Sequence, residues 1–346
     1  MKGLRLRAII LAAGRGLRLR PLTEDVPKPL LPVGGKPIVS YTLEVLAALG
    51  VEAAALNTHH LGEQIQQRLG ASFGGLPLTY SPEAELLGTL GAMDPLREFM
   101  EPADLVLVIN GDSLCRWPLK RLVKRHLKSG AGATLLFSKN ANRAQFGGGV
   151  AVSRARVESF HPDEKSRTGT ERLVFAGAHV FAPKLLDNVG EGTGDFVKDL
   201  YGPLVEVGGY IGAIATGRRW HDLGSPERYL EACLQQSLGS WTHRFLGRPW
   251  RADSASIHPS AKVKRSVVES GARLEPGVEV QESVVLPGAV VGEGSVVKRS
   301  IIGFNVELPA STMLVSRMVT RAKTGVAPEE DASTLGELSY TPLNRI

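Results

Sequence analysis

Small residues and positive charges come together in one loop near the N-terminus. The stretch LAAGRGLRLRPLT runs from Leu11 to Thr23, at the end of an apolar run, and PKPLLPVGGKPI follows at 27–38. Glycine and alanine let a backbone approach phosphate closely, and amide groups that follow a strand of a parallel sheet favour anions. Arg18 and Lys28 add cations that would stabilise charge on a departing pyrophosphate. The loop is therefore suited to hold a polyphosphate ligand.

Two aspartates are the second candidate for chemistry. Asp112 follows the apolar run at 105–110, in VINGDS, and Asp222 lies in RRWHDLGSPERY, just before a helix that begins near Ser225. Carboxylates are hard oxygen ligands for Mg²⁺, which takes phosphate oxygens and water for its remaining positions. Either aspartate alone would suit a turn or a helix cap equally well. The metal interpretation depends on their occurring together and on the resemblance described below.

Alternating apolar and amphipathic segments must position these residues. Short apolar runs at 8–13, 51–58 and 105–110 are typical of buried strands, and the amphipathic segments between them predict helices. This order predicts an α/β, Rossmann-like domain over residues 1–240, with a mostly parallel sheet covered by helices. A dinucleotide fingerprint is excluded, because Leu19 stands where a third glycine would be needed and prolines extend the loop.

The composition changes after about residue 255. An aliphatic residue recurs every five or six positions, with Gly, Pro and Ala between, so we expect a short left-handed parallel β-helix over 256–318. A β-sandwich would instead show alternation with period two and polar hairpin turns. Residues 241–255 are interpreted as a packed connector and 319–346 as an irregular polar tail. The recurring residues are Ile257, Val263, Val268, Leu274, Val280, Leu286, Val291, Val297, Ile302, Leu308 and Leu314.

Composition narrows the function classes. The chain has 346 residues and a formal net charge of +6, but its Lys and Arg are scattered and lack interleaved aromatic residues, which argues against nucleic-acid binding. No stretch approaches the roughly 20 apolar residues that a membrane span requires, so we expect no membrane partner. The two cysteines, Cys115 and Cys233, have no metal-ligand spacing around them and fit a reducing cytoplasm.

The N-terminal loop resembles the motif of the sugar-1-phosphate nucleotidyltransferase family, LAAGxGTRLxPLTxxxPKPLLPVxxKPI, over almost its whole length. The resemblance implies an enzyme that joins a nucleoside triphosphate to a sugar-1-phosphate and releases pyrophosphate. It also implies catalytic roles for Arg18 and Lys28, and a Mg²⁺ held by Asp112 and Asp222. The chain departs at Leu17, where the family often has Thr, so one hydroxyl that could contact phosphate is missing. The residues implied to hold the nucleotide in this loop are Leu11, Ala12, Ala13, Gly14 and Gly16.

Other segments resemble the base-binding and sugar-binding blocks of the same family. In SPEAELLGTLGA, at 81–92, Gly88 and Thr89 match a Gly-Thr pair that touches the base, and Glu83 or Glu85 could accept hydrogen bonds from guanine. FGGGV and FAGAHVF stand where relatives contact the sugar, although the Glu-Lys-Pro that many relatives carry between these blocks is absent. Gly148 and Gly177, or their neighbours, are implied to contact the sugar, and Lys198 could reach the sugar phosphate or be a solvent-exposed helix lysine.

The segment LNTHHLGEQI, at 56–65, resembles the mannose-, heptose- and N-acetylmuramate-1-phosphate branches of the family. Its adjacent His59 and His60 suggest a metal site. Neighbouring residues at a strand end point to opposite sides, however, and chelate poorly. We therefore expect these histidines to anchor the loop.

Several functions remain open on the sequence alone. GTP with a mannose- or heptose-type 1-phosphate is the first expectation, and UTP with N-acetylmuramate- or hexosamine-1-phosphate is the second. A regulatory protein that binds an NDP-sugar without turnover is an alternative of another class, although Arg18, Lys28, Asp112 and Asp222 are all present. An acyltransferase β-helix is disfavoured, because His258 is the only histidine of the repeat. The coils are interpreted as a packing or assembly module through which a homo-oligomer could form.

Overall fold

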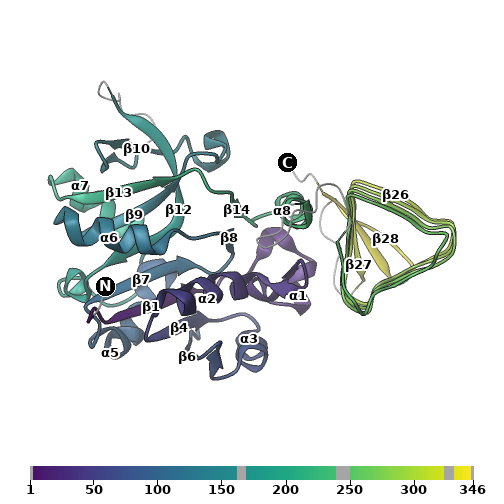
Figure 1. The fold of residues 1–346 in the computed structure, drawn as a ribbon, viewed down its shortest axis with the longest axis horizontal. Helices are drawn as coiled ribbons and strands as arrows, with labels where there is room; N and C mark the ends of the chain where they lie inside the picture. The colour runs from purple at the N-terminus through teal and green to yellow at the C-terminus, as the bar shows by residue number, and fades with distance from the viewer. Residues whose placement is uncertain (1–2, 162–168, 239–249, 323–330, 344–346) are drawn as a thin grey trace. The chain divides into compact units, whose positions relative to one another are not determined.

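The computed structural model describes residues 3–161, 169–238, 250–322 and 331–343 (Figure 1). They form two compact units, and the N-terminal loop contributes to both. The first unit takes residues from 1–15, 27–29 and 38–222, and the second from 16–26, 30–37 and 223–346. Within the described ranges, no helix combines the length and the hydrophobicity needed to cross a bilayer.

A ten-stranded sheet is the frame of the first unit. At its centre, β7 (Leu105–Asn110), β1 (Leu6–Leu11), β4 (Ala53–Thr58) and β6 (Leu76–Pro82) run parallel, each paired with the next. The remaining strands are β5 (Ser72–Phe73), β9 (Ala133–Ser138), β10 (Val150–Ser153), β11 (Arg156–Ser159), β12 (Glu171–Phe181) and β13 (Ile211–Thr216). The full order is β10-β11-β13-β9-β12-β7-β1-β4-β6-β5.

Burial explains why the central segments become strands. Residues 105–109 of β7 are all buried, as are Ala8, Ile9 and Ile10 of β1, and strands covered on both faces read as continuous apolar runs. The predicted Rossmann-like α/β fold is confirmed, with a mixed sheet, since β12 runs antiparallel to both β7 and β9. The principal helices of this unit are α2 (Ile38–Leu49), α3 (Gly62–Leu69) and α6 (Leu119–Ser129) (Figure 1).

Short helices complete the first unit and matter for the site. They are α4 (Gly88–Gly91), α5 (Arg97–Met100) and α7 (Gly202–Glu206), with the tighter or wider turns η3 (Asp94–Leu96), η4 (Arg143–Phe146), η5 (Pro183–Leu186) and η6 (Phe196–Tyr201). A separate antiparallel pair joins β8 (Ser113–Cys115) to β14 (Trp220–Asp222). Because β1, β4, β6 and β7 are parallel, their carboxyl ends meet at one edge of the sheet, where a ligand is expected.

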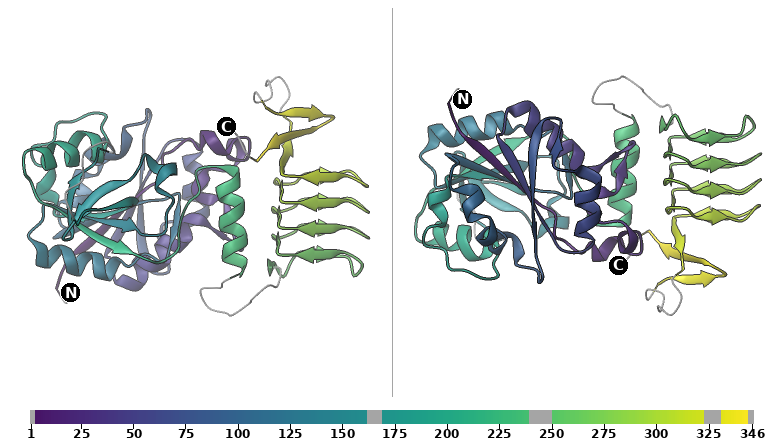
Figure 2. Two further views of the ribbon diagram at one scale, coloured as in Figure 1. Left: turned by 90° about the horizontal axis from the view of Figure 1, so that it is seen from above. Right: turned by 90° about the horizontal axis from the view of Figure 1, so that it is seen from below.

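A parallel β-helix dominates the second unit and confirms the expected repeat. Its triangular cross-section is visible end-on in Figure 1, and Figure 2 shows the coils stacked side by side. One face consists of β15 (Trp250–Arg251), β18 (Val267–Val268), β21 (Val284–Val285), β24 (Ile301–Ile302) and β27 (Arg317–Arg321). The second consists of β16 (Ser256–Ile257), β19 (Arg273–Leu274), β22 (Val290–Val291) and β25 (Glu307–Leu308). The third consists of β17 (Lys262–Lys264), β20 (Glu279–Gln281), β23 (Val296–Lys298) and β26 (Met313–Val315).

Each coil of the β-helix takes 17 residues. Val268 pairs with Val285, and Val285 pairs with Ile302. The inward residue of this strand is therefore Val285 and not the expected Leu286. Ser266, Ser283 and Ser300 form a buried ladder on the same period, in which each hydroxyl accepts a backbone N–H from the next coil at 3.0–3.2 Å. Each serine also donates to the carbonyl two residues earlier at 2.7 Å. The buried hydroxyls are therefore satisfied, as polar groups in a core must be.

Two predicted boundaries of this unit were wrong. Trp250 and Arg251 pair as β15 with β18, so the first coil begins inside the expected connector, of which 241–249 lies outside the described residues. The tail is not irregular, because β29 (Leu338–Pro342) pairs antiparallel with β27 and with β28 (Ser333–Leu335). Leu338 and Leu343 are buried. These strands extend one face of the β-helix and cover an edge that would otherwise present unpaired backbone groups.

The hairpin of β2 (Pro32–Val33) and β3 (Lys36–Pro37) belongs to the second unit, as does α8 (Pro226–Leu238). The Tyr229 hydroxyl of α8 donates to the Pro32 carbonyl at 2.6 Å. Glu269, which is 1% exposed, accepts the Gly35 N–H at 3.1 Å. The hairpin is thus hydrogen-bonded to the second coil of the β-helix and to α8.

Glu269 is expected to make the stability of the second unit depend on pH. Burial raises the pKa of its carboxyl group to about 7, although the Gly34 and Gly35 amides oppose the rise. A raised acid pKa contributes stability that is complete below about pH 4.5 and is lost as pH rises through about 7, a loss of up to about 3 kcal/mol. Tyr229 and Cys233 face Glu269 from α8, and burial raises the pKa of both, so they stay neutral over this range. The substitution Glu269→Gln should remove this contribution to the pH dependence of the free energy of unfolding.

Denaturant titrations at pH 5 and pH 8 measure the effect. The wild-type protein should be less stable at pH 8 than at pH 5, and Glu269→Gln should narrow that difference. Glu293→Gln changes an exposed carboxylate of the same β-helix and should leave the difference unaltered. An unchanged pH dependence in Glu269→Gln would show that this carboxyl group does not cause it.

Candidate functional site

A cavity of about 260 Å³ opens at the carboxyl edge of the sheet in the first unit. It lies where β1, β4 and β7 end and where the chain leaves β6. Its lining residues are Leu11, Ala12, Ala13, Gly14, Lys28, Pro29, Asn57, Glu83, Leu86, Gly88, Thr89, Asn110 and Asp112. The structure therefore brings together most of the residues that the sequence assigned to the nucleotide, along with Lys28 and one predicted metal ligand.

The small-residue loop after β1 is fixed by a side chain of β4. The Ala12 N–H donates to Asn57 Oδ1 at 2.8 Å, and Asn57 is buried at the end of its strand. The β1–β4 register, which pairs Leu11 with Asn57, makes this contact. Sequence reasoning missed Asn57, although a lone polar residue at the end of an apolar strand could have indicated it.

Glu83 continues this network and is 7% exposed. One carboxylate oxygen accepts from Asn57 Nδ2 at 2.7 Å, and the other accepts the Leu87 N–H at 3.1 Å. Glu83 therefore first connects β4 to the turn that carries Gly88, and only its remaining lone pairs could accept from a base. The alternative candidate Glu85 is exposed and does not line the cavity.

The histidine His59 anchors the same loop. Its Nδ1 lies 2.9 Å from the Glu83 carbonyl oxygen, and Arg15 Nε lies 3.4 Å from its Nε2. Among the described residues there is no group of three or more His, Cys, Asp or Glu side chains that could hold a metal. These contacts of His59 fit the anchoring role that was expected for it.

Lys28 and Asp112 form the charged wall of the cavity. Lys28 Nζ lies 2.5 Å from Asp112 Oδ2, with the lysine side chain 8% exposed and the aspartate side chain 34% exposed. The neighbouring Gly111 N–H donates to the Leu11 carbonyl at 2.8 Å, which joins the ends of β7 and β1. A lysine this buried presents its charge to the cavity and to Asp112 together.

The second predicted metal ligand, Asp222, lies on a strand that pairs with the segment directly after Asp112. Asp222 on β14 is the register partner of Ser113 on β8, the residue after Asp112. The two aspartates therefore stand on adjacent, paired segments. Two carboxylates form an incomplete set for a hard cation, which suits an ion that also takes phosphate oxygens and water.

Gly177, which the sequence assigned to the sugar, lies beside the cavity residue Asn110. Gly177 of β12 has φ 75°, and a Cβ added to it would lie 2.5 Å from Asn110 Nδ2, so only glycine leaves room for the cavity residue Asn110. Trp220 donates from Nε1 to the Ala176 carbonyl at 2.9 Å, and its ring centre lies 5.2 Å from that of Phe146. Sequence reasoning did not single out Asn110 as the neighbour of Gly177, since this contact depends on the tertiary fold.

None of the three sugar candidates, Gly148, Gly177 and Lys198, belongs to the cavity lining. Gly148, with φ 81°, follows η4 in a run of three glycines of positive φ, and Lys198 is exposed on η6. On the same π-helix as Lys198, the Tyr201 hydroxyl lies 2.5 Å from His179 Nδ1 in a buried aromatic cluster. Burial lowers the pKa of His179 to about 3, so this histidine stays neutral and serves the packing.

Gly16 and Arg18 belong to the second unit. Gly16 has φ 65° at the start of the short turn η1 (Leu17–Leu19), and Thr23 Oγ1 donates to its carbonyl at 2.8 Å. Arg18 is exposed, and Leu17, which replaces the family's threonine, is 54% exposed. Because so much of its side chain is exposed, Leu17 contributes little hydrophobic stabilisation to the loop.

A parallel sheet edge with a small-residue loop, a buried lysine and an aspartate defines an enzyme that works on phosphorylated nucleotides. Residues 7–237 match the family model described as nucleotidyl transferase, and residues 253–334 match the one described as GlmU-like, C-terminal hexapeptide. The chain belongs to the nucleotidyl transferase family. The match includes the whole cavity.

Relatives of known name agree with this assignment. A mannose-1-phosphate guanylyltransferase catalytic subunit beta from Xenopus tropicalis is 28% identical over 273 residues, which are 75% of this chain and 73% of the relative. A UTP–glucose-1-phosphate uridylyltransferase from Synechocystis is 30% identical over 66% of this chain and 62% of the relative. Among solved structures, HddC from Yersinia pseudotuberculosis complexed with GMP-PN has a TM-score of 0.56 and 26% identity, over 66% of this chain and 98% of that one.

Proposed function

We propose that this protein transfers a nucleotidyl group from a nucleoside triphosphate to a sugar-1-phosphate, giving an NDP-sugar and pyrophosphate. The observation that carries the proposal is the Lys28–Asp112 pair in the cavity at the end of β1 and β7. A phosphate-binding loop beside a cation and a carboxylate fits transfer of a phosphoryl-linked group, which needs positioning and charge stabilisation more than covalent catalysis.

In the proposed reaction a phosphate oxygen of the sugar-1-phosphate attacks the α-phosphorus of the nucleotide. The bond from this phosphorus to the bridging oxygen of pyrophosphate breaks on the opposite side, and that oxygen takes the electron pair. The backbone from Leu11 to Gly14 holds the nucleotide, while Lys28 and Arg18 offset negative charge on its phosphates and on the leaving pyrophosphate. No proton transfer or covalent enzyme intermediate is required.

Enzymes of this family generally use a divalent metal, and the carboxylates of Asp112 and Asp222 would hold Mg²⁺ here. Its double charge would offset the repulsion between the two phosphorylated substrates. The adjacent positions of these aspartates on paired segments support the assignment. Lys28 already contacts Asp112, so the lysine and the metal would share one carboxylate.

We infer GTP and a mannose- or heptose-type 1-phosphate as the first substrate pair. The guanylyltransferase relative and the GMP-PN complex of HddC support guanine, and the free lone pairs of Glu83 could accept from its N–H donors. UTP is the alternative, favoured by the uridylyltransferase relative. Gly148 and Gly177 are the proposed sugar contacts, and Lys198 is the proposed contact of the sugar phosphate. The free cysteines support a cytoplasmic location, and the β-helix is the proposed surface for a homo-oligomer.

Pyrophosphate release tests this function directly. GTP, UTP, dTTP, CTP and ATP are each combined with several sugar-1-phosphates, with Mg²⁺ and again with EDTA. We expect metal-dependent release for one nucleotide, with GTP the strongest. Folded protein that binds an NDP-sugar but releases no pyrophosphate from any pair would instead support the non-catalytic alternative.

A further inference from the structure

The turn that carries Gly88 and Thr89 is bound to a distant segment of the first unit. The Leu90 N–H donates to the Gly194 carbonyl at 2.8 Å, and the Gly194 N–H donates to the Leu87 carbonyl at 2.9 Å. A Cβ on Gly88 would lie 2.4 Å from Gly194 O, so the two backbones can approach only because position 88 is glycine. This side of the nucleotide cavity therefore depends on where the 192–196 segment lies.

Thr89 makes the side-chain part of this link. Its hydroxyl donates to Asp195 Oδ2 at 3.0 Å and accepts the Phe196 N–H at 3.0 Å. A hydroxyl has one proton to donate, so Thr89 in this arrangement has none left for a nucleotide. The threonine that the sequence assigned to the base acts first as a joint between two segments.

Asp195 is the other half of the joint. Its Oδ1 accepts from the N–H groups of Val197 and Lys198 at 2.8 and 3.0 Å, which caps the start of η6. η6 is a π-helix, a rare form that occurs frequently at functional sites, and it carries Lys198. One oxygen of Asp195 thus holds the nucleotide turn and the other holds the proposed sugar-phosphate helix, although Asp195 does not itself line the cavity.

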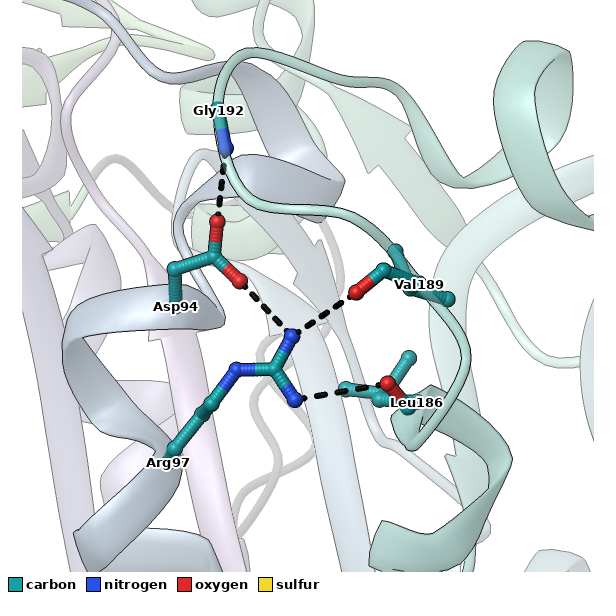
Figure 3. Close-up of polar contacts among 5 residues, drawn as sticks. All are labelled: Asp94, Arg97, Leu186, Val189 and Gly192. Atoms are coloured by element: carbon teal, nitrogen blue, oxygen red, sulfur yellow. Dashed lines mark hydrogen bonds and ion pairs between the residues drawn. The ribbon is translucent and has the colours of Figure 1, made fainter.

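The segment that leads to Asp195 is anchored as well. Arg97 Nη2 donates to Asp94 Oδ1 at 3.0 Å and to the Val189 carbonyl at 3.1 Å, and Arg97 Nη1 donates to the Leu186 carbonyl at 3.3 Å. Asp94 Oδ2 also accepts the Gly192 N–H at 2.9 Å (Figure 3). The segment 186–196 is therefore held at its start by Asp94 and Arg97 and at its end by the turn that carries Thr89.

We propose that Asp195 is a positioning residue that couples the two substrate sites, by ordering the Gly88–Thr89 turn for the nucleotide and the first turn of η6 for the sugar phosphate. The identity of the two ligands rests on the proposed function, whereas the link between the segments does not. Removing either the Thr89 hydroxyl or the Asp195 carboxylate should therefore weaken the binding of both substrates, although neither group contacts both of them.

Three variants test the coupling: Thr89→Val, Asp195→Ala and Thr89→Ser. Thr89→Val and Asp195→Ala should each raise the Kd of GTP and the KM of the sugar phosphate about tenfold, the effect of one lost hydrogen bond to a charged acceptor. Thr89→Ser keeps the hydroxyl and should restore both values to within about twofold. Thr193→Val removes an exposed hydroxyl two residues before Asp195 and should change neither. Calorimetry with GTP and Mg²⁺, and with UTP and Mg²⁺, gives the Kd values.

Amide hydrogen exchange without any ligand reports the link itself. Thr89→Val should speed exchange at the Phe196 amide, and Asp195→Ala should speed it at Val197 and Lys198, while β7 stays protected. Weaker nucleotide binding in Thr89→Val but not in Asp195→Ala would mean that the hydroxyl contacts the nucleotide directly, which overturns the proposal. Unchanged exchange in both variants would also overturn it. A wild-type protein that releases no pyrophosphate would count against the proposed function, while the exchange result would still decide the link.

Discussion

Replacing Asp112 by Asn should lower turnover by about three orders of magnitude, because the carboxylate that would hold the metal and balance Lys28 loses its charge. The fold should persist, since Asp112 is 34% exposed on its side chain and the asparagine oxygen can still accept from Lys28 Nζ. The measurement is pyrophosphate release at saturating nucleotide and sugar phosphate, with Mg²⁺ varied over a wide range.

The metal dependence sharpens this test. If Asp112 holds the ion, added Mg²⁺ should restore only a small part of the lost turnover of Asp112→Asn. Asp187→Asn is the matched control, because Asp187 is an exposed aspartate away from the cavity lining, and it should behave as wild type. Near-normal kcat in Asp112→Asn would remove this residue from the proposed mechanism, even if the family assignment stands.

The edge of the sheet that carries the site was predictable from local patterns. Apolar runs identified β1, β4 and β7, and the rule that parallel strands end at one edge brought Leu11 and Asp112 together before any contact was known. Lys28 lies with the small-residue loop in the cavity lining, while its role toward phosphate stays a prediction. These inferences needed only the strand type and the order of the segments.

Residues whose roles depend on register were not predictable in the same way. Asn57 supports Ala12 because β1 and β4 pair Leu11 with Asn57, and no sequence pattern fixes that register. Glu83 was one of two candidates to accept from a base, and its bonds from Asn57 Nδ2 and the Leu87 N–H could not be foreseen, since they depend on the tertiary fold. Thr89 was assigned to the nucleotide by resemblance, whereas its partner Asp195 is more than 100 residues away.

The β-helix shows the same division. Its period was visible in the sequence, because one aliphatic residue per strand must point inward. Leu286 was chosen over Val285 since both are apolar and adjacent, and only the pairing of Val285 with Val268 and Ile302 separates them. The strand at Leu338–Pro342 was missed because its pairing partner is the end of the repeat itself.

Lys28→Met should lower turnover by about two to three orders of magnitude, the usual cost of losing one preorganised donor to a developing charge. Lys28 is 7% exposed and lines the cavity, so its charge acts within the site rather than in bulk solvent. Methionine retains a similar length and apolar volume, which keeps the packing. Lys28→Arg retains the charge and should lose less, although its broader head group fits a compact, buried site poorly.

The pairing of Lys28 with Asp112 leads to a second result for Lys28→Met that a simple loss of packing would not give. The lysine and the metal would share the Asp112 carboxylate, so removing the lysine should lower the Mg²⁺ concentration needed for half-maximal activity while kcat falls. The double variant Lys28→Met with Asp112→Asn should be little worse than Asp112→Asn alone, because residues that act as a unit are not additive. Fully multiplicative losses, with an unchanged Mg²⁺ requirement, would mean that the two side chains act independently and that their ion pair is not part of the mechanism.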